Sequence, residues 1–127
     1  MLDFILFQDC SFNKLLSDTA LKVSFQGTMR VYGSGVKCNR WYFKFNNNKC
    51  SGPTTIDAVV CNNWPSGNPT LLRHRSFEGY CENIPQGAVR VELWIGQCLS
   101  YQALGDAVSA WISVSRIMIE EVSRPQS

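Results

Sequence analysis

The residues with the most informative chemistry in this chain are its six cysteines: Cys10, Cys38, Cys50, Cys61, Cys81 and Cys98. None forms a Cys-x-x-Cys pair and His74 is the single histidine, so the closely spaced ligands of a structural zinc site are missing. An even number of cysteines that lack the spacing of metal ligands indicates disulfide bonds, and hence a protein that resides in an oxidising compartment. Buried free thiols in a cytosolic protein are the alternative, and the sequence does not choose among the possible pairings.

The remaining ionisable residues do not suggest catalysis. His74 lies between Arg73 and Arg75, which disfavour its protonated form and offer no carboxylate to orient its ring. Glu78 and Glu82 are four residues apart in an expected loop, which is a poor basis for a glycosidase pair. The other acids are scattered, so we expect no calcium site, no metal, no cofactor and no enzymatic activity.

Basic residues are unevenly distributed along the chain. No acid occurs between Asp18 and Asp57, whereas six cations do: Lys22, Arg30, Lys37, Arg40, Lys44 and Lys49. A solvated strand face is the ordinary interpretation. The alternative is a surface for sulfated glycans or an acidic protein partner. The formal net charge of +2 argues against a dedicated nucleic-acid binder.

The strands that must position these residues are marked by alternation of apolar and polar side chains. Within Ala20–Tyr32 the odd positions are mostly apolar and the even ones polar, which predicts a half-buried strand with a bulge or bend at Gly27. Gly33–Gly35 predicts a turn. Trp41–Phe45 alternates again, and the polar run Asn46–Asn48 ends it in turn chemistry.

Further strands are predicted over Thr54–Cys61, Leu71–Phe77, Ala88–Cys98 and Ser113–Val122. The intervening segments are expected to be connections, over Cys61–Thr70, Gly79–Gly87 and Leu99–Val108, with one helical turn as an option within Ala103–Ala110. The apolar start, Met1–Asp9, is a first strand or an artificial beginning, and not a signal peptide. No apolar run approaches the ~20 residues that span a bilayer, so no membrane insertion is expected.

These 127 residues, 45% of them hydrophobic, predict one compact all-β domain over residues 1–127, of the sandwich, barrel or jelly-roll type. The strand aromatics are expected in the core or at a subunit interface: Trp41, Tyr42, Phe43, Phe45, Trp94 and Trp111. Trp64, in a predicted loop, either binds a partner or packs back onto the sheet.

Several long stretches resemble the C-terminal domain of collagen triple helix repeat-containing protein 1 and its invertebrate relatives. The resemblance extends from about Cys10 to Val122, and the stretches that carry it include Ala20–Gly27, Cys38–Asn46, Cys50–Pro53, Ile56–Val60, Glu78–Glu82, Leu93–Cys98 and Trp111–Glu121. It implies a secreted, extracellular-matrix family with a collagen stretch before this domain. It also implies a jelly roll similar to complement C1q and tumour necrosis factor that forms homotrimers, and a link to Wnt and Frizzled-type signalling.

On this resemblance the chain is expected to be a non-enzymatic trimerisation and recognition domain, with a matrix component or receptor as partner. A glycan- or receptor-binding module with incidental assembly is the alternative. The chain departs from the family in lacking a Gly-X-Y repeat, and Pro69 interrupts the family's glycosylation site. Five cysteines match family positions and Cys61 does not, which leaves either a new bridge to Cys61 or a free thiol.

Overall fold

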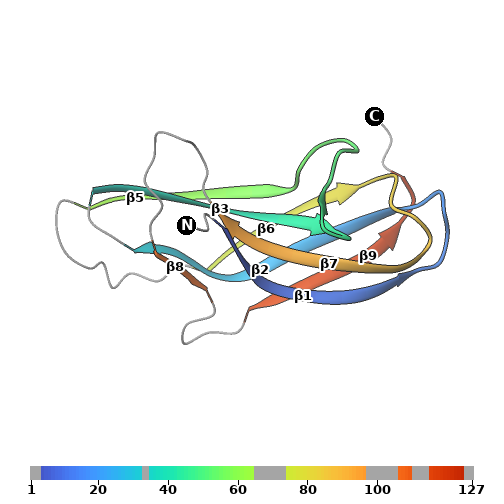
Figure 1. Ribbon diagram of the computed structural model, residues 1–127, viewed down its shortest axis with the longest axis horizontal. Helices are drawn as coiled ribbons and strands as arrows, with labels where there is room; N and C mark the ends of the chain where they lie inside the picture. Colours follow the sequence, from blue (N-terminus) through green and yellow to red (C-terminus); the bar gives the residue numbers. More distant parts are fainter. Residues whose placement is uncertain (1–3, 33–34, 65–73, 97–105, 110–114, 125–127) are drawn as a thin grey trace.

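The structure is a computed structural model that describes residues 4–32, 35–64, 74–96, 106–109 and 115–124. Within those ranges the chain forms nine strands and no helix, and hence no helix that could cross a membrane. The strands form two antiparallel sheets that run along the long axis of the molecule (Figure 1). The prediction of an all-β sandwich is therefore confirmed.

The five-stranded sheet has β7 (Gly87–Gly96) and β3 (Gly35–Phe45) at its centre. β1 (Phe4–Lys14) pairs with the outer edge of β7, so the apolar N-terminal segment is a strand. On its other edge β3 pairs with β5 (Asp57–Trp64) and then with the short β4 (Asn48–Lys49).

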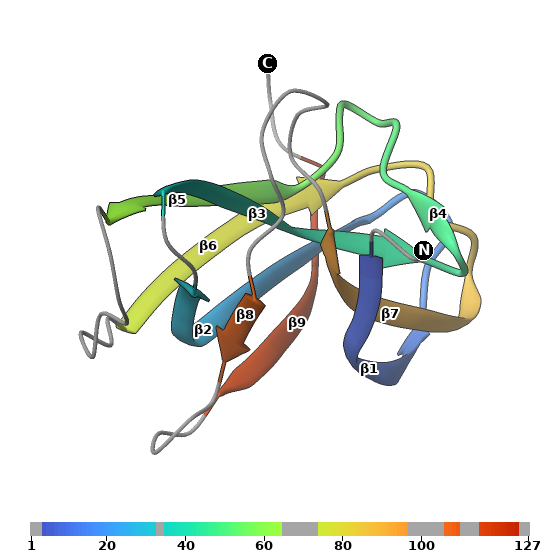
Figure 2. The ribbon, with the colours of Figure 1, turned by 60° about the vertical axis from the view of Figure 1, so that its left-hand side comes forward.

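The four-stranded sheet is built around β2 (Ala20–Tyr32), the longest strand. β6 (His74–Cys81) pairs with one edge of β2. On the other edge, β9 (Arg116–Val122) pairs with the first half of β2 and β8 (Asp106–Ser109) with the second half. Figure 2, turned by 60°, shows these strands beside the β1–β7–β3 layer.

The core lies between the two sheets and follows the predicted alternation. Leu21, Val23 and Phe25 of β2 are fully buried, and they meet side chains from the other sheet that are also buried: Trp41, Phe43 and Phe45 of β3, and Val89, Val91 and Leu93 of β7. The rings of Phe25 and Phe43 both contact Phe77 of β6, at centroid distances of 6.2 and 5.4 Å. Since burying one such side chain contributes about 1.5–3 kcal/mol, this layer is the main source of stability.

Two glycines are required because another residue packs closely against them, and not because the chain turns there. Gly27 pairs in unbroken register with Arg75, so the predicted bulge is wrong; a Cβ there would lie 2.7 Å from Cβ of Ser115. Gly79 lies inside β6, and a Cβ there would lie 2.8 Å from Cγ1 of Ile56. Both positions therefore exclude a side chain because another residue occupies the space.

Three predicted connections contain strand residues. β6 continues to Cys81, β5 extends through Trp64, and Asp106–Ser109 is strand β8, neither loop nor helical turn. β3 likewise begins at Gly35, well before the predicted start at Trp41. These segments lack clear alternation, and hydrogen bonding to an adjacent strand determines their conformation.

The structure contains two disulfides, Cys38–Cys61 and Cys50–Cys81. Of the two options left open for Cys61, the bridge is the one that forms. Cys10, in β1, is a free thiol on the core side of the sheet, whereas Cys98 lies outside the described residues. Burial, and to a smaller extent the charge of Asp9, raise the pKa of the Cys10 thiol.

Candidate functional site: the outer face of the five-stranded sheet

The outer face of the five-stranded sheet brings together three of the cations and two of the aromatic residues singled out in the sequence. Because the odd residues of β3 point into the core, the even ones point outward. The strand register then places residues of β5 and β7 beside them. We call this surface the cation–aromatic face; it comprises Arg40, Tyr42, Lys44, Lys49, Asp57, Val59, Glu92 and Trp94.

Cations lie over both rings of this face. Nζ of Lys44 is 4.4 Å from the centroid of Trp94. Tyr42 carries two cations, with Cζ of Arg40 at 4.8 Å and Nζ of Lys49 at 5.1 Å from its ring centroid. Each such contact contributes about 0.5–1 kcal/mol when exposed. They leave Tyr42 only 5% exposed, although it points away from the core.

The buried carboxylate of Glu92 holds this arrangement in place. Glu92 is 1% exposed; its Oε1 accepts a hydrogen bond from Nε1 of Trp94 at 2.9 Å, and its Oε2 accepts one from the Asn47 N–H at 2.7 Å. Asn46 and Asn47 have φ of 50° and 70°, as a two-residue hairpin requires, which confirms the predicted turn. Glu92 therefore orients the indole and the β3–β4 hairpin together.

The opposite end of the face is held by an ion pair. Nε of Arg40 lies 2.9 Å from Oδ2 of Asp57, at an angle that does not make a hydrogen bond. Arg40 also affects Tyr42: burial raises the pKa of the phenol, and the guanidinium charge opposes part of that rise. Beside Arg40 in the register is Val59, which is 53% exposed.

The structure brings together only part of the basic series. Arg40, Lys44 and Lys49 lie on the cation–aromatic face, whereas Lys22 lies on the outer face of the other sheet, 3.9 Å from Glu78. Its ammonium is 5.9 Å from the ring centroid of Tyr80. The side chains of Arg30 and Lys37 lie outside the described part of the structure.

The predicted aromatic set also divides. Trp41, Phe43 and Phe45 belong to the core, whereas Tyr42 and Trp94 belong to the cation–aromatic face. Trp111 lies outside the described residues.

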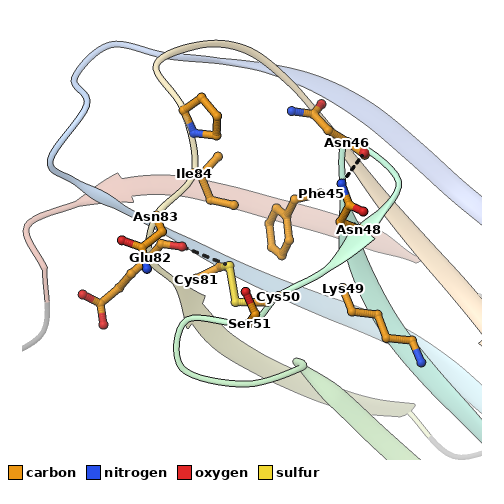
Figure 3. A pocket seen from close by; sticks show the side chains of 11 residues that line it. Phe45, Asn46, Asn48, Lys49, Cys50, Ser51, Cys81, Glu82, Asn83 and Ile84 are labelled. Atoms are coloured by element: carbon orange, nitrogen blue, oxygen red, sulfur yellow. Dashed lines mark hydrogen bonds between the residues drawn. A yellow bond between two sulfur atoms is a disulfide. The ribbon is translucent and has the colours of Figure 1, made fainter.

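A second surface feature is a pocket of about 200 Å³ beside the Cys50–Cys81 disulfide (Figure 3). Its ionisable lining residues are Lys49 and Glu82, and Glu82 accepts a hydrogen bond from Nε of Arg124 at 2.9 Å. Glu78 and Glu82 thus have separate cationic partners. Within the described ranges no three His, Cys, Asp or Glu side chains are placed to hold a metal ion.

Sequence reasoning missed Glu92, Asp57 and Val59 as parts of this face. The alternation within Ala88–Cys98 does put Glu92 and Trp94 on the same side of one strand. It does not reveal that Glu92 is buried, because its partner Asn47 comes from another hairpin.

Comparison with known proteins identifies one family. The family model described as "CTHRC1, C-terminal domain" matches residues 1–119, which is nearly the whole chain. No solved structure matches the chain.

Proposed function

The chain belongs to the CTHRC1 C-terminal domain family, and from that premise we propose that it is a trimerisation and recognition domain. In this proposal three copies pack around a three-fold axis and align three chains in register. The trimer then presents three copies of each exposed loop to a matrix component or receptor, which raises avidity without new contacts. A partner in Wnt and Frizzled-type signalling is part of the proposal.

The properties of the family support this proposal. It is an extracellular, collagen-associated and non-catalytic domain type. The two disulfides fit a protein that is exported to an oxidising compartment. We therefore propose that this chain is secreted into the extracellular matrix.

The composition of the cation–aromatic face carries the assembly proposal. The solvent side of an antiparallel sheet is usually polar. Here Val59 is exposed and lies on the same face as Tyr42 and the half-buried Trp94. Aromatic residues and Arg are enriched at protein interfaces, and this face has both. Packing a second subunit over it would remove the exposed valine from water.

A pair of matched substitutions tests the proposal. Val59 and Met118 are 53% and 52% exposed and lie on opposite sheets, so a glutamate at either position does not disturb the core. Val59→Glu would bury a charge in the assembly and is expected to yield monomers. Met118→Glu is expected to remain a trimer. Light scattering with mass determination at micromolar concentration distinguishes the three proteins.

A monomeric wild-type protein under these conditions would rule out the trimer. A trimer that survives Val59→Glu but dissociates with Met118→Glu would place the interface on the four-stranded sheet instead.

Sulfated-glycan binding is a second candidate, favoured by the three cations on one face. Since such binding is electrostatic, the salt needed to elute the protein from heparin measures it. Lys49→Gln is expected to lower that salt concentration, whereas Lys22→Gln, on the opposite sheet, is not. If both variants elute with the wild type, the cation–aromatic face does not bind the glycan.

A further inference from the structure

The two disulfides of this domain differ sharply in accessibility. Cys50 and Cys81 are 4% and 1% exposed and belong to the hydrophobic core. Cys38 is also buried, but its partner Cys61 is exposed to solvent. One sulfur-bearing residue of the Cys38–Cys61 bridge is therefore open to reagents in solution, and neither residue of the other bridge is.

The two disulfides also tie together different parts of the fold. Cys50, just after β4, and the last residue of β6, Cys81, connect segments that belong to different sheets. Cys38 and Cys61 are directly opposite in the register of β3 and β5, with Cα atoms 4.1 Å apart. These two strands are already paired from Gly35–Trp64 to Tyr42–Asp57. Opening the Cys38–Cys61 bridge therefore leaves its strands held by their backbone ladder.

The position of Cys61 favours attack from outside. A thiolate displaces one sulfur of a disulfide by approaching the other along the S–S line, so access to the attacked sulfur controls the rate. Among the described residues β5 pairs only with β3, which makes it an edge strand. Because Cys61 is the exposed residue of the bridge and Cys38 is buried, attack is expected at the sulfur of Cys61, with the sulfur of Cys38 leaving.

We propose that Cys61 is a thiol-exchange site, at which the folded domain accepts a small extracellular thiol of the glutathione class. The thiolate of the small molecule forms a new S–S bond to Sγ of Cys61. The Cys38–Cys61 bond breaks, and Sγ of Cys38 leaves as a thiolate that takes up a proton from water. A second small thiol can then release Cys61 as a thiol and form the oxidised dimer of the small molecule.

Differential alkylation tests this proposal on the folded protein. After incubation with reduced glutathione, free thiols are blocked with N-ethylmaleimide and the cysteine peptides are identified by mass. The expected products are a glutathione adduct on Cys61 and a blocked thiol on Cys38, while Cys50–Cys81 stays intact. The exposed bridge should open at least about ten-fold faster than the buried one. Equal rates for the two bridges, or adducts on Cys50 or Cys81 first, would overturn the proposal.

Assembly is controlled for separately, because Cys38 and Cys61 lie at one end of the cation–aromatic face. The same reaction is run on Val59→Glu, in which the proposed interface is disrupted. Fast exchange in either protein supports the exchange site, and slow exchange in both contradicts it, whatever the oligomeric state.

A second variant keeps the test independent of how the bridge opens. In Cys38→Ser the thiol of Cys61 has lost its bridge partner, and oxidised glutathione should modify it at least about ten-fold faster than Cys10. Cys10 is an internal control, since it lies on the core side of β1. Modification of Cys10 before Cys61 contradicts the proposal.

Discussion

At the scale of single residues, the carboxylate of Glu121 organises the loop between β1 and β2. It accepts hydrogen bonds from the backbone N–H groups of Leu15 and Leu16, at 2.8 and 2.9 Å, and from the hydroxyl of Thr19. Nζ of the buried Lys14 donates to the carbonyl of Leu16. Leu15 and Leu16 consequently project into solvent from a fixed backbone.

This arrangement predicts a specific pH dependence. The hydrogen bond from Leu15, then that from Thr19, and the charge of Lys14 among smaller causes, lower the pKa of Glu121 below its ordinary 4.5. A carboxyl with a lower pKa in the folded state stabilises the fold above 4.5, and that contribution is lost as the pH falls through the folded value. Glu121→Gln should therefore lose less stability than the wild type between about pH 5 and pH 3.

Urea unfolding at a series of pH values measures this difference. Glu120→Gln is the control, because its exposed neighbour position makes none of these hydrogen bonds. Equal acid sensitivity of Glu121→Gln and wild type would show that the carboxylate does not hold the loop.

At the scale of elements, close contact between segments that are far apart in the chain determines where glycine is required. Ile56 is buried, and its carbonyl accepts a hydrogen bond from the Phe43 N–H at 3.0 Å, so it cannot move away from Gly79 freely. Gly79→Ala is expected to lower the free energy of unfolding by about 1–3 kcal/mol through overpacking. Chemical denaturation followed by tryptophan fluorescence measures the loss.

A double-mutant cycle separates overpacking from a general preference for glycine in β6. In an Ile56→Ala background the added methyl group has space, so Gly79→Ala should cost less than in the wild type. If the cost is unchanged, contact with Ile56 is not the cause.

At the scale of the whole molecule, the two disulfides are expected to contribute unequally to stability. Their sequence separations are 23 and 31 residues, so the entropy they remove from the unfolded chain differs by only about 0.3 kcal/mol. The difference must come from the folded state. Replacing both Cys50 and Cys81 by serine buries two hydroxyl groups in the core, at about 1–3 kcal/mol for each that is unsatisfied.

Serine at Cys38 and Cys61 buries only one hydroxyl, because Cys61 is exposed. The double variant at Cys50 and Cys81 should therefore be less stable than the double variant at Cys38 and Cys61 by about 1–3 kcal/mol. Thermal and urea unfolding of the two double variants, compared with the wild type, provide the measurement. Equal losses would mean that chain entropy alone accounts for both bridges.

Local sequence patterns were sufficient to predict much of this fold. The alternation in Ala20–Tyr32 and Ala88–Cys98 correctly predicted the inward side chains of β2 and β7, and Asn46–Asn48 predicted the hairpin. The β8 strand at Asp106–Ser109 was not predicted, because four residues are too few to display a period and its hydrogen bonds come from β2. A bulge or bend was predicted at Gly27 because the sequence does not show that Ser115 lies against it.

For the candidate site, the sequence by itself determined the all-β class, the family and the residue types available, since alternation and motif order are local properties. Only the tertiary structure decided which of them meet. It moved Lys22 away from Arg40, buried Glu92, and paired Cys61 with Cys38. Each of these outcomes depends on strand order and register, which arise from contacts between residues far apart in the chain.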